Sequence, residues 1–155
     1  MRWMALHGLM GIYSPRDPIA LGYVLKGVDD KDPRVSQKAI QMLNAFSHFS
    51  VEISGPLATR LYALDPGVRF SAATVLWRFD KANADKVLPV FIAELAQEVP
   101  SRNESNAIRL LAEIGSAAKP AVPSLQVIAE NPTRGESVRA EAKKAIEKIG
   151  GETKI

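Results

Sequence analysis

The sequence contains no cysteine among its 155 residues and only two histidines, His7 and His48. Without cysteine there is no disulfide scaffold, no thiolate zinc site and no cysteine nucleophile. A chain without cysteine fits an oxidising or a reducing compartment, and the cytoplasm is slightly favoured. Neither histidine has a second ligand residue at helical spacing, as a metal site on a helix would need. We therefore expect no metal and no other cofactor.

Long hydrophobic runs are missing as well. A typical run, Val87 to Ala93, contains Pro89 and is far shorter than the roughly 20 apolar residues of a membrane-spanning helix. The apolar N-terminal residues resemble a signal peptide only superficially, because His7 interrupts them and no small-x-small cleavage site follows before Ser14. We expect no membrane partner.

No part of the chain carries a block of one charge. Twenty basic and 17 acidic residues give a net charge of +3. Residues 1–50, 51–100 and 101–155 carry net charges of +2, −1 and +2. Binding to a phosphate backbone requires several convergent Lys and Arg residues. The dispersed charge therefore predicts no specific binding to nucleic acid.

Catalytic and phosphate-binding motifs are also missing. Gly22 and Gly27 have the outer spacing of a phosphate-binding loop, but no Lys and Ser or Thr follow them. The acidic cluster at residues 29–32 lacks the central Gly and closing Glu of a calcium loop. We interpret this cluster as a solvated turn in which Asp32 caps a helix, and we predict that the protein is not an enzyme.

The sequence does contain an internal repeat. The pattern Asp-Pro, then Val, at residues 32–35 recurs at residues 65–68, with weaker copies that start near residues 103 and 135. Positions 0, 4, 8 and 11 of the four copies form four columns: Val35, Val68, Asn103 and Val138; Ala39, Ala72, Ala107 and Ala142; Leu43, Leu76, Leu111 and Ile146; Phe46, Phe79, Ile114 and Ile149. This spacing lies on one face of a helix, and the small alanines predict close approach of a neighbouring helix.

Each repeat start also carries the residues typical of a helix start. Asp32 and Asp65 stand directly before a proline, which suits the first helical position. Two further starts have the spacing of a capping box, at Ser101 with Glu104 and at Thr133 with Glu136. Gly115 and Gly150 are expected to end their helices.

Shorter apolar segments between these helices predict the first helix of each repeat, at residues 19–26, 57–64, 84–97 and 121–130, so that the helix with the four columns is the second. No strand pattern competes. The chain is thus predicted to be a single all-α domain, residues 1–155, in which a helix, a turn and a second helix recur about every 34 residues. The predicted parts are a half repeat at 1–13 and repeats at 17–48, 55–80, 84–115 and 118–150.

This pattern resembles HEAT repeats of the short bacterial type, in the armadillo-like α-solenoid class. The resemblance rests on residues 65–69, on Ala107 to Gly115 and on residues 118–125, and it covers about residues 17–150. It implies a right-handed α-solenoid of about four and a half repeats, whose second helices line a concave surface. Asn103 and Ser36 depart from the family pattern, which suggests looser packing there.

The predicted binding surface lies at positions 2, 6 and 9 of the second helices, counted from the same starts as the four columns. These positions point away from the packed face, and position 5 flanks them. Its candidate partner-binding residues are Phe70, Trp77, Ile40, Gln41, Asn44 and Arg109. Phe70 and Trp77, two turns apart, are expected to be exposed in the groove. The other interpretation is that their helix rotates and Trp77 packs against a neighbouring repeat. The charged last helix is interpreted as a terminal repeat that faces water.

We therefore expect a non-catalytic scaffold or adaptor that binds a protein or peptide on its concave face. The alternative is a HEAT-like DNA-binding protein or an enzyme similar to alkylpurine DNA glycosylases, because Trp77, Arg78 and Asp80 weakly resemble their site. A likeness to bilin lyases would rest on the fold alone. Residues 1–13 lack a covering helix, so self-association or docking through them is also expected.

Overall fold

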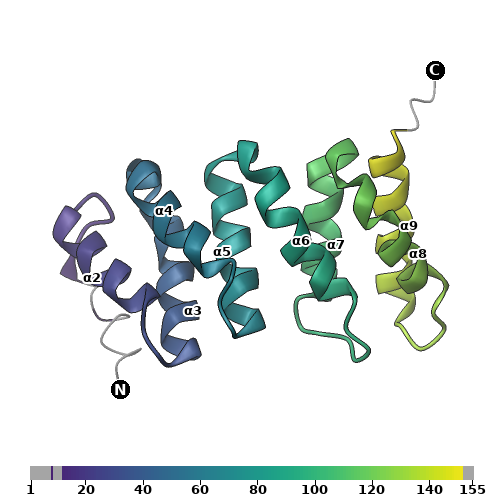
Figure 1. The fold of residues 1–155 in the computed structure, drawn as a ribbon, viewed down its shortest axis with the longest axis horizontal. Coiled ribbons are helices and arrows are strands. Elements are labelled where there is room, and N and C mark those ends of the chain that lie inside the picture. Colours follow the sequence, from purple (N-terminus) through teal and green to yellow (C-terminus); the bar gives the residue numbers. More distant parts are fainter. Residues whose placement is uncertain (1–7, 9–11, 152–155) are drawn as a thin grey trace. The chain divides into compact units, whose positions relative to one another are not determined.

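The computed structural model describes residue 8 and residues 12–151 of the chain (Figure 1). The described part is all-helical and contains no strand. It forms two compact units, Met1–Asp80 and Lys81–Ile155, and each unit is described by itself. The predicted half repeat at residues 1–13 lies mostly outside the described residues, and so does the docking or self-association expected of it.

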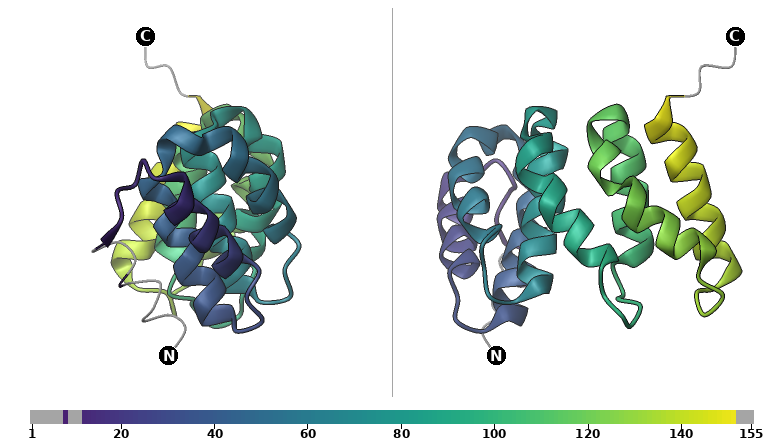
Figure 2. Two further views of the ribbon diagram at one scale, coloured as in Figure 1. Left: turned by 90° about the vertical axis from the view of Figure 1, so that its left-hand side faces the viewer. Right: turned by 45° about the vertical axis from the view of Figure 1, so that its right-hand side comes forward.

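The first unit contains two helical hairpins. Its helices are α2 (Pro18–Val28), α3 (Pro33–Met42), α4 (Ser50–Arg60) and α5 (Pro66–Phe79). Helix α2 packs on α3, α4 packs on α5, and the second helices α3 and α5 pack on each other. The two hairpins therefore stack through their second helices, as Figures 1 and 2 show.

The second unit repeats this arrangement. Helix α6 (Ala84–Leu95) packs on α7 (Glu104–Ile114), and α8 (Val122–Glu130) packs on α9 (Glu136–Gly150). A 3₁₀ segment, Gly115–Ala121, leads from α7 into α8. The second helices α7 and α9 again contact each other. The helix-turn-helix pattern predicted from the sequence is thus present twice in each unit.

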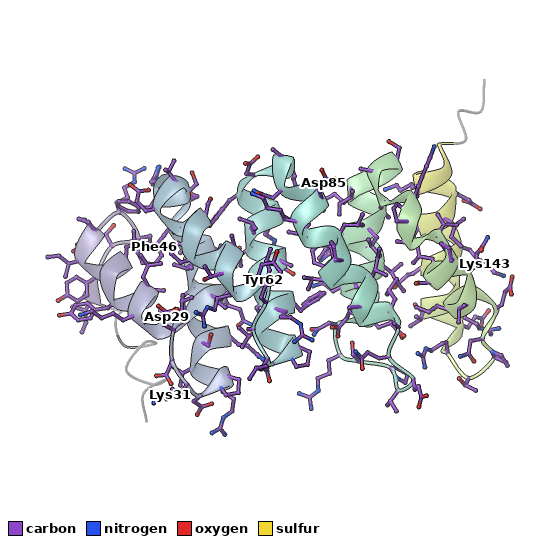
Figure 3. The ribbon with its side chains drawn as sticks, in the orientation of Figure 1. Asp29, Lys31, Phe46, Tyr62, Asp85 and Lys143 are labelled. Carbon is purple, nitrogen blue, oxygen red and sulfur yellow. The ribbon has the colours of Figure 1, made fainter. Side chains whose placement is uncertain are left out.

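The predicted apolar columns face the core. All four alanines of the second column, Ala39, Ala72, Ala107 and Ala142, are completely buried. Phe46 of the last column is completely buried in the first unit (Figure 3). No residue of the four columns is exposed, although Asn103 is only half-buried. A larger side chain in the alanine column would overpack the contact between second helices.

Two of the predicted helix starts are confirmed. The Asp32 carboxylate accepts a hydrogen bond from the Arg34 N–H at 3.0 Å, and the Asp65 carboxylate accepts one from the Val68 N–H at 2.9 Å. In both helices proline follows the cap, at a position where no backbone N–H is missed. The hydrogen bond from the Arg34 side chain to Asp32 raises the pKa of the Arg34 guanidinium.

The two predicted capping boxes are wrong. Helices α7 and α9 start after Asn103 and Gly135, and neither cap residue makes a side-chain hydrogen bond to the helix. The reason at α7 is tertiary: the Glu104 carboxylate is held by Arg134 instead of reaching back to its own helix start. Gly115 caps the end of α7 with a φ of +72°, as expected, whereas Gly150 is the last residue of α9 and the cap is Gly151.

Helix α4 begins earlier than the sequence pattern indicated. It starts at Ser50, seven residues before the predicted start at residue 57, and continues through Pro56 to Arg60. Leu57 and Leu61 are buried as expected, but Leu64 lies beyond the helix and is 99% exposed. The shift moves the first helix of this repeat toward residue 50 and leaves an exposed apolar loop before Asp65.

An ion pair fixes the start of α7 inside the second unit. Arg134, from the loop before α9, lies with its Nε 3.0 Å from Glu104 Oε1, and both side chains are buried. Arg134 also donates to the backbone carbonyls of Gln97 at 2.8 Å and Glu98 at 3.1 Å. One guanidinium thus ties the loop between α6 and α7 to the loop between α8 and α9, which holds α7 and α9 in register.

Candidate functional site

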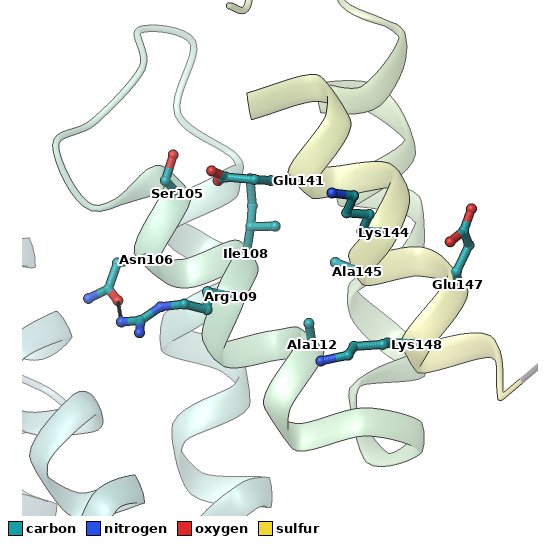
Figure 4. A pocket seen from close by; sticks show the side chains of 10 residues that line it. All are labelled: Ser105, Asn106, Ile108, Arg109, Ala112, Glu141, Lys144, Ala145, Glu147 and Lys148. Atoms are coloured by element: carbon teal, nitrogen blue, oxygen red, sulfur yellow. Dashed lines mark hydrogen bonds between the residues drawn. The ribbon is translucent and has the colours of Figure 1, made fainter. Parts of the chain in front are cut away.

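A groove of about 920 Å³ lies between α7 and α9 in the second unit (Figure 4). Its lining residues are Ser105, Asn106, Ile108, Arg109, Ala112, Glu141, Lys144, Ala145, Glu147 and Lys148. All of them come from the two second helices of this unit. In Figure 4 the helices run in the same direction, with Ser105 near Glu141 at one end and Ala112 near Lys148 at the other.

Helical spacing explains why these residues share a face. Ser105, Arg109 and Ala112 are four and three residues apart, so they form one stripe along α7. On α9, Glu141, Lys144 and Lys148 form a second stripe with the same spacing. The alanine column of each helix turns toward the core, which leaves the two polar stripes on the outside.

The floor of the groove is apolar but already covered. Ile108 and Ala145 each retain only 1% of their surface in water. The side chains that remain available are the polar and charged ones on the walls: Ser105, Arg109, Lys144 and Lys148 are all exposed. The groove therefore offers a partner charged and hydrogen-bonding groups together with apolar surface on its walls.

The charged side chains of the groove are free of ion pairs in the described part of the chain. Three are cationic and two anionic: Arg109, Lys144, Lys148, Glu141 and Glu147. Arg109 Nη2 donates to Asn106 Oδ1 on the same helix, and in Figure 4 this contact turns the guanidinium away from α9 without neutralising it.

The charges are also unevenly placed along the groove. In Figure 4, Glu141 lies at the Ser105 end, whereas Lys148 reaches across toward Ala112 at the other end. The Glu147 carboxylate is directed away from α7. The end of the groove near Ala112 is therefore the more basic one.

Arg109 is the one predicted binding residue that lies in this groove. Gln41 lies on α3 of the first unit and is exposed, and half-buried Asn44 lies in the 3₁₀ turn Leu43–Ala45 that follows α3. Asn44 Oδ1 accepts a hydrogen bond from Arg78 Nη1 at 3.3 Å, which joins this turn to α5. The structure does not bring the six predicted residues together at one site.

The expected exposure of the apolar candidates is wrong. Phe70 retains 4% of its surface, Trp77 retains 5%, and Ile40 is completely buried. Ile40 follows the packed Ala39 and shares its buried side of the helix. Residues 72–77 of α5 are all buried, so the part of the helix that carries Trp77 has no water-facing side. The alternative interpretation, in which Trp77 packs inside the protein, agrees with its burial.

The sequence analysis missed the contribution of the charged last helix. Glu141, Lys144 and Lys148 were interpreted as the water-facing side of a terminal repeat, yet they form one wall of the groove. The available signal was the stripe itself, since Lys144 stands in the same column as Arg109. The two stripes are about 35 residues apart in the sequence, and the sequence alone did not show how close they lie in the fold.

The remaining candidates have simpler roles. His48 is exposed and accepts a hydrogen bond from Arg16 Nε at 3.2 Å. Within the acidic cluster, Asp32 caps α3 and Asp29 pairs with Arg60 at 3.1 Å. No group of three or more potential metal-ligating side chains occurs in residues 8 and 12–151. In the same residues, no helix combines the length and the apolar character that a membrane span requires.

No protein-family model matches the chain, and no curated protein matches it either.

Proposed function

We propose that this chain is a HEAT-like repeat protein that acts as a non-catalytic scaffold or adaptor and binds a protein or peptide in the groove between α7 and α9. The groove itself is the observation that carries the proposal. It lies on the outer face of two adjacent second helices, the face on which binding was expected from the repeat register.

The groove is suited to binding because its walls are held before a partner arrives. The buried Arg134–Glu104 pair and the two carbonyl contacts of Arg134 fix the start of α7 relative to the loop before α9. A preorganised surface loses little conformational entropy on binding. The charged side chains on the walls need no internal ion pair to be broken before they contact a partner.

The DNA glycosylase alternative loses its main support. It relied on an exposed aromatic side chain at Trp77 beside Arg78 and Asp80, but Trp77 is 5% exposed. Arg78 is exposed and is hydrogen-bonded to Asn44. The dispersed charge of the sequence also argues against this alternative.

A matched pair of substitutions tests the proposed site. Ala112→Arg places a long side chain in the groove, and Ala93→Arg places the same side chain on the exposed surface of α6 in the same unit. A partner recovered by affinity capture and then purified should bind the native chain and Ala93→Arg equally, and Ala112→Arg much more weakly. Equal binding to both variants would place the partner elsewhere and contradict the proposal.

We also propose that the repeats within each unit follow the right-handed α-solenoid that the HEAT resemblance implies. The support is the shared arrangement of first and second helices in each unit and the common register of the alanine column. A crystal structure in which the two hairpins of a unit stack with the opposite hand would contradict this proposal.

A further inference from the structure

The exposed lining of the groove between α7 and α9 is more apolar than polar. Its apolar surface comes from half-buried Ala112 and from the methylene stems of Arg109, Lys144 and Lys148. The gain from burying apolar groups is proportional to the area removed from water. A partner therefore gains most by laying apolar side chains along the groove, between these stems and over Ala112.

The charges of the groove do not select a partner of one sign. The three cations and two carboxylates of the lining sum to only +1. In Figure 4 the Arg109 guanidinium is turned away from α9, and the Lys144 ammonium lies on the Glu141 side. Lys148 alone lies at the Ala112 end. The groove thus favours a largely apolar partner surface with one acidic group near Lys148.

An extended peptide would be poorly satisfied in this groove. A strand that binds at a sheet edge pairs with free backbone groups, but the part of the chain that the structure describes contains no strand. Within α7 and α9 the backbone groups are bonded along their own helices. Side-chain acceptors for peptide N–H groups are few, since Asn106 Oδ1 already accepts from Arg109 and the Glu147 carboxylate is directed away from α7. A helix needs no such acceptors, because it satisfies its backbone groups internally.

The length of the groove matches a short stretch of helix. Ser105 and Ala112 on α7 are seven residues apart, and so are Glu141 and Lys148 on α9. Seven residues span two helical turns, or about 10 Å. A partner helix can therefore lie along the groove for two turns, with apolar side chains at positions i, i+3 or i+4, and i+7 of its contact face.

We infer that the partner binds through an amphipathic helix, which packs its apolar face between the stems of Arg109, Lys144 and Lys148 and carries an acidic residue beside Lys148. The inference rests on the proposed function and names the class of partner. Acidic side chains stabilise a helix when they lie in its first turn, so the acidic residue belongs at the start of the partner helix. Because Lys148 lies near the C-terminal end of α9, the partner helix runs antiparallel to α9.

The first experiment compares two peptide libraries displayed on phage, of equal length and composition. One has apolar residues at helical spacing, and the other has them at every second position, as in a strand. The targets are the full chain, the groove variants Ala112→Arg and Ser105→Arg, and Ala93→Arg on the exposed surface of α6. Circular dichroism confirms that each variant is folded, and Ser105 is exposed, so its replacement does not disturb the core.

The inference predicts the origin of the groove-dependent clones, which bind the native chain and Ala93→Arg but neither groove variant. They should come from the helical library and carry Asp or Glu at the start of the pattern.

The second experiment tests the helix itself, by fluorescence anisotropy on a selected peptide. One water-facing residue in the middle of the peptide is replaced by Pro, and the matched control replaces the same residue by Ala. Proline in a helix interior should weaken binding by about a hundredfold. Alanine at the same position should change affinity by less than about twofold.

A charge exchange tests the direction of the helix. Replacing the acidic residue in the first turn of the peptide by Lys should weaken binding to the native chain by up to about fivefold, and Lys148→Glu should restore it. Lys143→Glu is the control, because Lys143 is exposed on the same helix but lies outside the groove. The control should not restore binding.

The outcomes separate the inference from the proposed function. Groove-dependent clones that come mainly from the strand-pattern library, or peptides that bind equally well with Pro and with Ala, would overturn the inference and leave the proposed function intact. A helical library without groove-dependent clones would also overturn the inference, as would equal restoration by Lys148→Glu and Lys143→Glu. Clones that bind both groove variants as well as the native chain would overturn both the inference and the proposed function.

Discussion

Arg134 and Glu104 form an ion pair with an Nε–Oε1 distance of 3.0 Å, and their side chains are 6% and 5% exposed. The pair joins the loop before α9 to the first residue of α7. It also explains why Glu104 does not form the capping box that its sequence position suggests. Since α7 and α9 are the walls of the groove, the pair links the stability of the second unit to the shape of its candidate site.

Arg134→Met should lower the free energy of unfolding by about 3–5 kcal/mol, because it leaves the Glu104 carboxylate buried without its partner. It also removes the donors to the Gln97 and Glu98 carbonyls. Urea denaturation followed by circular dichroism measures the change. Glu113→Gln is the control, because the Lys81–Glu113 pair is about half exposed on both sides and should contribute less than about 1 kcal/mol. Similar losses for both variants would contradict the structural role of the buried pair.

Trp77→Ala should cost about 3–5 kcal/mol of stability, since the side chain is 5% exposed and its removal leaves a cavity. With Trp3 replaced by Phe, the fluorescence of Trp77 should be blue-shifted and protected from a polar quencher. A red-shifted and readily quenched signal, together with a loss below about 0.5 kcal/mol, would show instead that Trp77 lies on the surface.

Gly115→Ala should destabilise the protein by about 1–3 kcal/mol, because Gly115 has φ +72° and ψ −138°, a backbone region that side-chain-bearing residues rarely occupy. Gly55→Ala is the matched control. Gly55 lies inside α4 without a positive φ, and a Cβ there would meet no atom within 4 Å, so this change should be neutral or stabilising. Thermal melts of the two variants measure the difference, and equal melting temperatures would count against the observed end of α7.

Asp65→Ala should cost about 1 kcal/mol or somewhat more. The Asp65 carboxylate caps α5 through the Val68 N–H and also accepts a hydrogen bond from Gln37 Nε2 at 3.0 Å, so it joins two second helices. Asp65→Asn keeps an acceptor and should restore most of the stability. If Asp65→Ala unfolds at the same denaturant concentration as the native chain, the cap contributes nothing.

The helices, their periodicity and two of their caps could be predicted because they depend on local sequence. The alanine column is one example, since helical spacing alone places Ala39 and Ala72 on a packed face. The burial of Trp77 could not be predicted from its own column, because it depends on the packing that covers residues 72–77 of α5 on all sides. Likewise, Glu104 has the spacing of a capping box, and only its contact with Arg134, 30 residues away, prevents that box.

The sequence predicted which face of the helix carries the candidate site, but it did not predict that a second helix turns this face into a groove. The register placed Arg109 on the outer face of its helix, and this position lines the groove. The opposite wall comes from Glu141, Lys144 and Lys148, whose approach to α7 depends on tertiary packing.

Chemical-shift mapping with the purified partner tests the central claim most directly. The account predicts that backbone amide signals of Ser105, Arg109, Ala112, Lys144 and Lys148 move on titration and that signals of α3 and α5 stay in place. Movement confined to α3 and α5, or shifts that Ala112→Arg leaves unchanged, would contradict the claim that this groove is the binding site.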